Sequence, residues 1–157
     1  MRERIVINLE SIVVDGARAE EPRQSRTVIV VDRELAIGRA ANAAAVLALS
    51  LGASRPDLPG VDLVDASGGR HRGLFADGLP ILSARASEIA RTRDAAAGHP
   101  DILVIDFPAT GQTTNDYDEF RGLVARTPPE ELRYVGIALH GPAEAVRLLT
   151  RRLSLLR

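Results

Sequence analysis

Three residue types that suit ligand binding lie within five positions of each other, at Gly38, Arg39 and Asn42. Gly38 follows a predicted strand and opens a predicted helix, where free backbone N–H groups favour an anion or a polarised carbonyl. Arg39 adds a fork of donors, and Asn42 lies one turn further on the same face as Gly38. Asn42 also interrupts a run of five alanines, where almost any residue would make a better helix. The sequence therefore predicts a ligand-binding group here; the alternative is a glycine turn, a solvated arginine and a polar helix residue.

A second polar cluster begins with Asp106, at the end of a predicted buried strand, and continues through Thr113 and Thr114. Loops that follow buried strand ends are where α/β proteins usually gather polar groups for ligands. We expect Asp106, Thr113 and Thr114 to contribute to a site. The alternative for Thr114 and Asn115 is that they cap the next helix.

The three histidines suggest acid–base chemistry only weakly. Asp65 and His71 face each other across a predicted hairpin and could form an acid–base pair, but Asp, Ser and Gly are also ordinary turn formers. His140 and Gly141 follow a strand, and we expect them to face the same crevice as Asn42. No two histidines are separated by the number of residues typical of a pair of metal ligands, so the sequence predicts no metal site.

Composition excludes several classes of enzyme. The 157 residues contain no Cys and no Lys, so all 20 basic residues are Arg. Thiol nucleophiles, thiolate metal sites, Schiff-base enzymes and phosphate-loop nucleotidases are therefore excluded, and we expect no cofactor. The net charge of -1 provides no overall electrostatic field that would attract nucleic acid or an anionic membrane. The five aromatic residues are too few for a surface on which bases stack. The apolar stretch 5–9 is too short for a signal peptide, so we expect a cytoplasmic location.

Strands that alternate with helices must position these residues. Buried strands are predicted over residues 27–32, 101–107 and 134–139, a strand near a sheet edge over 79–83, and a hairpin over 61–75 that turns at Gly68 and Gly69. Four helices are predicted. The first covers 39–51, the second runs from a cap at Ser83 or Ser87 to about 97, and the third runs from Thr114 or Asn115 to Pro128. The fourth covers 143–152 and follows a turn at His140, Gly141 and Pro142. This order predicts an α/β fold, a three-layer α/β/α sandwich with a small mixed sheet. We expect one domain over residues 27–157 and an arm or extra element over 1–26.

Segments 28–52, 64–73 and 134–157 together resemble the bacterial domain-of-unknown-function family 2000. That family is similar in fold to type II peptidyl-tRNA hydrolases, whose first strand leads to a glycine–lysine pair, two alanines, a glutamine and then a histidine. Gly38 matches this motif, Arg39 stands at the lysine position and Asn42 at the glutamine position. The histidine is replaced by one of three alanines, 43–45.

The resemblance extends to the other candidate residues. Asp106 and the Thr-Gly-Gln-Thr segment 110–113 stand roughly where the hydrolases have an Asp-Ala-Gly motif and a following threonine. Gly141 and Pro142, with Thr150 and the leucines after it, match the hydrolase ending. The resemblance implies the peptidyl-tRNA hydrolase-like sandwich and a homodimer.

Two functions are consistent with these residues. The first is a hydrolase or acyl transferase for an ester or amide of a small or tRNA-linked acyl group, in which Arg39 and Asn42 orient or polarise the carbonyl and Asp106 positions a water. The second is a non-catalytic module that binds a small anionic or amide ligand in the same crevice. The missing lysine and histidine favour the second function or a changed substrate, and the charge disfavours tRNA.

Overall fold

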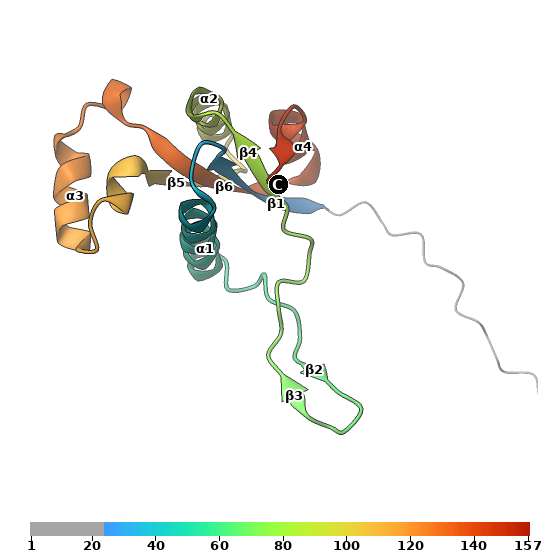
Figure 1. Cartoon of the computed structure of the whole chain (residues 1–157). Helices are drawn as coiled ribbons and strands as arrows, with labels where there is room; N and C mark the ends of the chain where they lie inside the picture. The colour runs from blue at the N-terminus through green and yellow to red at the C-terminus, as the bar shows by residue number, and fades with distance from the viewer. Residues whose placement is uncertain (1–23) are drawn as a thin grey trace, which may run out of the picture.

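The computed structural model describes residues 24–157 and places a five-stranded mixed sheet at the centre of the domain (Figure 1). The predicted arm lies outside the described residues except for its last three positions. The strand order is β5-β6-β1-β4-β7, and only the β1–β4 pair is parallel. The strands are β1 (Ser25–Asp32), β4 (Ile81–Ala84), β5 (Leu103–Pro108), β6 (Tyr134–Pro142) and β7 (Ser154–Leu155).

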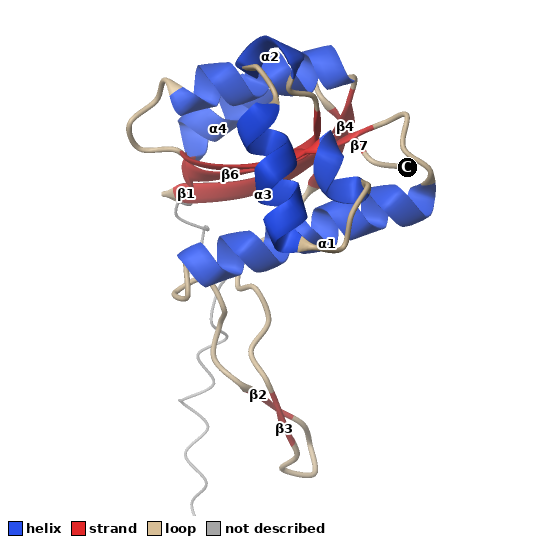
Figure 2. Ribbon diagram, turned by 90° about the vertical axis from the view of Figure 1, so that its left-hand side faces the viewer, coloured by secondary structure: helices blue, strands red, loops and turns tan. Residues whose placement is uncertain are grey.

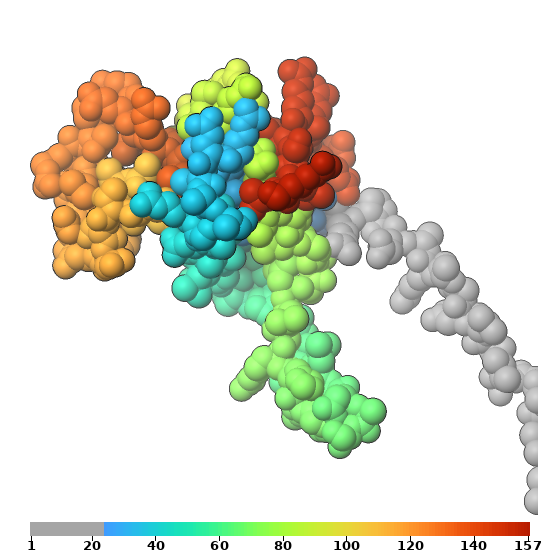
Figure 3. Space-filling view, viewed as in Figure 1, coloured from blue at the N-terminus to red at the C-terminus, as the bar shows by residue number. Residues whose placement is uncertain are grey.

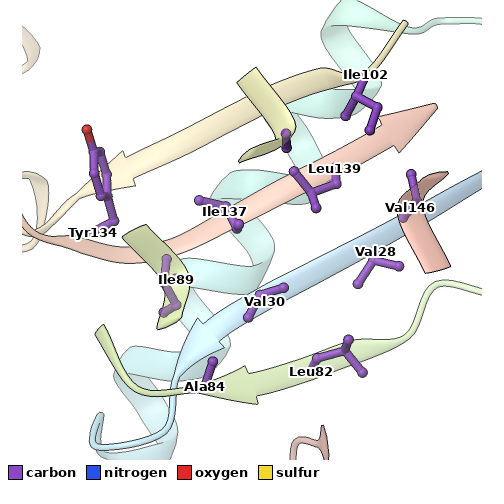
Figure 4. Packing of buried hydrophobic residues seen from close by; sticks show 11 residues of the cluster. Val28, Val30, Leu82, Ala84, Ile89, Ile102, Tyr134, Ile137, Leu139 and Val146 are labelled. Carbon is purple, nitrogen blue, oxygen red and sulfur yellow. The ribbon is translucent and has the colours of Figure 1, made fainter. Parts of the chain in front are cut away.

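Helices cover both faces of this sheet, as Figure 2 shows, so the predicted three-layer arrangement is found. Helices α2 (Ala86–Ala97) and α4 (Ala143–Thr150) pack on one face, and α1 (Ile37–Ser54) packs on the other. Because strand side chains alternate, Val28 and Val30 of β1 enter the α2/α4 core (Figure 4). Ile29 and Val31 point to the other face and enter the α1 core. The β-branched run of β1 is therefore buried on both sides.

Helix α3 (Tyr117–Arg126) joins the α1 side at its periphery. The Phe120 ring lies edge-on to Phe107 of β5, with 6.4 Å between the ring centroids. A short 3-10 helix, η1 (Ala109–Gln112), links β5 to α3, and a second, η2 (Pro129–Glu131), links α3 to β6. The chain between β5 and β6 therefore forms a small lobe beside α1.

Helix α1 is a core helix of unusual composition. Ala40, Ala43 and Leu47 are among its buried residues, yet Ile37 and Leu49 on its outer side are 73% and 78% exposed. By length and composition alone it is also apolar enough to cross a membrane. Arg39 is the one charged residue of the helix, so its exposed side has far fewer charged side chains than a surface helix usually has.

The predicted hairpin is present and stands out from the body of the domain (Figure 3). Its strands, β2 (Leu63–Val64) and β3 (Arg70–His71), have two residues each. The turn requires Gly68, whose φ is +87°, and the Asp65 carboxylate accepts hydrogen bonds from the N–H groups of Ser67 and Gly69 at 2.8 and 2.9 Å. Local contacts therefore maintain the hairpin.

Two predicted helix caps and one predicted turn are wrong. Helix α2 starts from Arg85 instead of a serine, because the Glu88 carboxylate reaches back to the Arg85 N–H at 2.9 Å. Helix α3 is capped by the Asp116 side chain, which accepts from the Glu119 N–H. The predicted turn at His140, Gly141 and Pro142 is instead the end of β6, since these residues pair with 25–27 of β1.

Candidate functional site

The start of α1 carries the first predicted cluster on an open surface. Gly38, Arg39 and Asn42 are all exposed. Within the described chain, no side chain caps this helix and no carboxylate lies in its first turn. The positive end of the helix dipole is therefore available to an anion or a carbonyl oxygen.

The η1 segment lies against this end of α1. The Gln112 side-chain amide donates a hydrogen bond to the Arg39 carbonyl oxygen at 3.2 Å, across 73 positions of sequence. About two turns further along α1, Val46 lines a pocket together with Thr114, which follows η1. Because Asn42 precedes Val46 by four residues, it lies between these two contacts on one stripe of the helix. The structure thus brings Arg39, Asn42 and Thr114 to one side of the domain.

The pocket between α1 and the lobe has a volume of about 190 Å³. Its inner wall is apolar, and polar groups lie at its rim. Asp116 at the rim caps α3, and Thr114 Oγ1 beside it accepts a hydrogen bond from the Asp116 N–H at 3.0 Å. Thr113 donates its hydroxyl to the Thr110 carbonyl at 2.6 Å. The lining residues are Val46, Phe107, Gly111, Thr114, Asn115, Asp116, Tyr117 and Phe120.

Asp106 is not part of this site. Its neighbours in β5, Ile105 and Phe107, belong to the α1 core, so Asp106 points to the opposite face of the sheet. There its carboxylate accepts a hydrogen bond from Arg93 Nε of α2 at 2.9 Å. This contact raises the pKa of Arg93 above its ordinary value. The predicted assembly of Arg39, Asn42 and Asp106 is therefore wrong.

Asp65 and His71 do meet, but away from the start of α1. His71 Nε2 lies 3.3 Å from the Asp65 carboxylate, and both side chains are exposed. Hydrogen bonds from Ser67 and Gly69 lower the pKa of Asp65 to about 2. The hairpin base packs against the last turns of α1, where Ala48 and Gly52 share a pocket with Leu74. Since α1 is about 27 Å long, this pair is remote from Asn42.

His140 is a core residue, contrary to the prediction that it faces the crevice. It is 3% exposed, and its Nδ1 lies 2.8 Å from the hydroxyl of Thr27, which is buried beside it in β1. Burial lowers the pKa of His140, and the charge of Arg55 just beyond the end of α1 lowers it further. Gly141 is required for packing, because a Cβ there would lie 2.7 Å from the Asp101 carbonyl oxygen. Both residues therefore have structural roles.

The family described as "Protein of unknown function (DUF2000)" matches residues 25–157. The chain belongs to this family. A solved structure of a protein of unknown function, Atu0240 from Agrobacterium tumefaciens strain C58, superposes with a TM-score of 0.77 at 15% identity, covering 85% of this chain and 98% of that chain. At this identity the likeness shows the fold alone. No curated protein matches.

Membership of the DUF2000 family confirms the resemblance seen in segments 28–52, 64–73 and 134–157. The mixed α/β fold is likewise confirmed. The further likeness to type II peptidyl-tRNA hydrolases stays a prediction. Within the described residues, no group of three His, Asp or Glu side chains is arranged to hold a metal ion.

Proposed function

We propose that this DUF2000 domain binds a small ligand with an anionic or amide head group and an apolar tail. The head group contacts Arg39, Asn42 and the first N–H groups of α1, and the tail enters the pocket beside Val46. The observation that carries the proposal is the 190 Å³ apolar pocket directly along the helix from Asn42. Ligand pockets commonly combine apolar walls with a few polar groups that fix orientation.

Binding without catalysis fits the arrangement better than hydrolysis does. A general acid or base must lie within hydrogen-bond reach of the reacting atoms. Asp106 is on the other face of the sheet with Arg93, and His140 is buried with Thr27. If the likeness to the hydrolases extends to this site, Arg39 replaces a compact ammonium by a guanidinium, which changes reach and geometry.

The proposal is tested with N-acetyl-leucine and N-acetyl-leucinamide as probes. We expect saturable changes in the amide NMR signals of residues 38–46 and 110–117. Asn42→Ala is expected to weaken binding about tenfold, since one hydrogen bond is lost. Ser50→Ala, two turns further along α1, is the matched control and leaves binding unchanged.

A second measurement addresses catalysis. The same proteins are incubated with N-acetyl amino acid esters and bulk peptidyl-tRNA. We expect no turnover above the buffer rate. Hydrolysis that disappears in Asn42→Ala would refute the non-catalytic assignment and favour the hydrolase, whereas probe binding unchanged by Asn42→Ala would refute this site.

A further inference from the structure

A larger pocket lies on the opposite face of the sheet, between the start of α2 and the chain that enters β6. Its volume is about 500 Å³. On the helix side it is walled by small residues, Ala86, Ser87 and Ala90, which leave room that larger side chains would fill. The other lining residues are Glu130, Glu131, Leu132, Arg133 and Tyr134.

Tyr134 contributes a hydroxyl that is unpaired within the described part of the chain. The residue is only 9% exposed and belongs to the α2/α4 core. Among residues 24–157 its hydroxyl makes no hydrogen bond, and Figure 4 shows the oxygen at the end of the ring that points away from the sheet. The ring is buried, while the hydroxyl opens to the pocket, where it can donate to a bound molecule without breaking a protein contact. The open position beside Tyr134 therefore suits a ligand atom.

The Tyr134 ring is held in place from the α2 side. The Arg93 guanidinium carbon lies 5.4 Å from the ring centroid, and the same guanidinium is bound to Asp106. Burial raises the pKa of Tyr134, so the phenol stays protonated and keeps its donor at neutral pH. The hydroxyl is thus a fixed, neutral hydrogen-bond donor.

The start of α2 supplies further donors next to this hydroxyl. Ala86 and Ser87 are in the first turn of a 12-residue helix, where N–H groups are not used within the helix. Ala86 and Ala90 face the pocket at a spacing of four, whereas Glu88 lies about 200° around the helix from Ala86 and bonds the Arg85 N–H. The pocket side of this helix start therefore offers N–H donors and carries no carboxylate of α2 itself.

The opposite rim carries charges of both signs, the carboxylates of Glu130 and Glu131 and the guanidinium of Arg133. The two carboxylates attract an ammonium and repel a doubly charged phosphate, whereas Arg133 attracts a carboxylate. A molecule with a carboxylate at one end and an ammonium at the other matches both sides of the pocket. We propose that this pocket binds a small zwitterion of the amino-acid class, with its carboxylate on the Tyr134 hydroxyl, Ser87 and the start of α2, and its ammonium toward Glu130 and Glu131.

The chain provides its own reporter for a test. It has two tyrosines, Tyr117 and Tyr134, and no tryptophan, so in Tyr117→Phe all tyrosine fluorescence comes from Tyr134. This variant is titrated with L-alanine, L-leucine, acetate, methylamine and inorganic phosphate. We expect a saturable change with the amino acids, at concentrations at least tenfold lower than any change with acetate or methylamine. Phosphate that binds more tightly than every amino acid would refute the proposal, as would the absence of a change with the amino acids at millimolar concentration.

Two variants of the otherwise unchanged chain test the residues by calorimetry. Tyr134→Phe keeps the ring and is expected to weaken amino-acid binding about tenfold, with no loss of melting temperature, because the hydroxyl has no partner to lose. Ala90→Leu fills the pocket and is expected to abolish binding, while Ala95→Leu on the exposed side of α2 does not. Equal affinity in Tyr134→Phe or in folded Ala90→Leu would refute the site. Asn42→Ala is expected to leave it intact, which separates this pocket from the one beside α1.

Discussion

Replacing Thr27 by valine would test whether the buried contact between β1 and β6 stabilises the domain. The substitution conserves the branched shape of the side chain but removes the hydroxyl that meets His140 Nδ1 at 2.8 Å. Both residues are almost completely buried, so no water can replace the lost partner. An unsatisfied buried polar atom costs about 1–3 kcal/mol, and the added methyl group returns less than about 1 kcal/mol. We expect a net loss of roughly 1–2 kcal/mol.

The free energy of unfolding is measured by urea denaturation at pH 7.5, followed by circular dichroism. For a chain of this size, 1 kcal/mol corresponds to a shift in melting temperature of about 2–4 °C. Thr150→Val is the matched control, because Thr150 is also buried but donates its hydroxyl only to the Val146 carbonyl of its own helix. We expect the control to cost less than Thr27→Val. If Thr27→Val is as stable as the wild type, or the control costs as much, the contact with His140 does not stabilise the fold.

Three other predictions concern pH, the hairpin and association. The folded protein holds the pKa of His140 below its unfolded value, so the stability that this residue contributes is fully present above about pH 6.5. That contribution is lost as the pH falls toward the folded pKa. We therefore expect the stability difference between wild type and His140→Gln, measured in urea melts, to shrink from pH 7.5 to 5.5. Asp65→Ala removes the acceptor of the hairpin turn, and we expect altered amide NMR signals confined to residues 61–75, with melting temperature changed by less than about 2 °C; a global loss of stability would contradict the view that the hairpin is held locally. Arg39 is the one charged residue of α1, and we expect the apolar exposed residues around Leu49 to mediate a homodimer. Light scattering should find a dimer for the wild type and a monomer for Leu49→Glu, and a wild-type monomer at 100 times the assay concentration would refute this expectation.

The central elements could be predicted because each has a strong local signal. The β-branched run of β1 and the alanine-rich run of α1 have one plausible structure each, and both form where expected. The turn at Gly68 was also predictable, since a glycine pair between two polar runs favours a left-handed residue. These signals are contained within a few neighbouring positions.

The candidate site could be predicted only in part, because its errors depend on contacts between distant segments. Asp106 lies within β5, a strand covered on both sides, and its apolar neighbours show no alternation from which to tell which face it points to. His140 and Gly141 resemble a turn, yet pairing with β1 extends β6 through them. The Gln112 contact with Arg39 and the Tyr134 pocket had no motif to mark them, since each depends on how the β5–β6 connection folds back on the sheet.

The projecting hairpin has a consequence for how this domain can change. Its turn is held by Asp65 within the hairpin itself, and only its base, near Leu74, touches α1. The five-stranded sheet contains no residue of β2 or β3. Peptides inserted between Ser67 and Gly69 would therefore leave the five-stranded sheet and its two apolar cores untouched, and lineages could lengthen or shorten this segment independently of the core. The tip offers protein engineers a display position on a scaffold that contains no cysteine or lysine of its own to interfere with labelling.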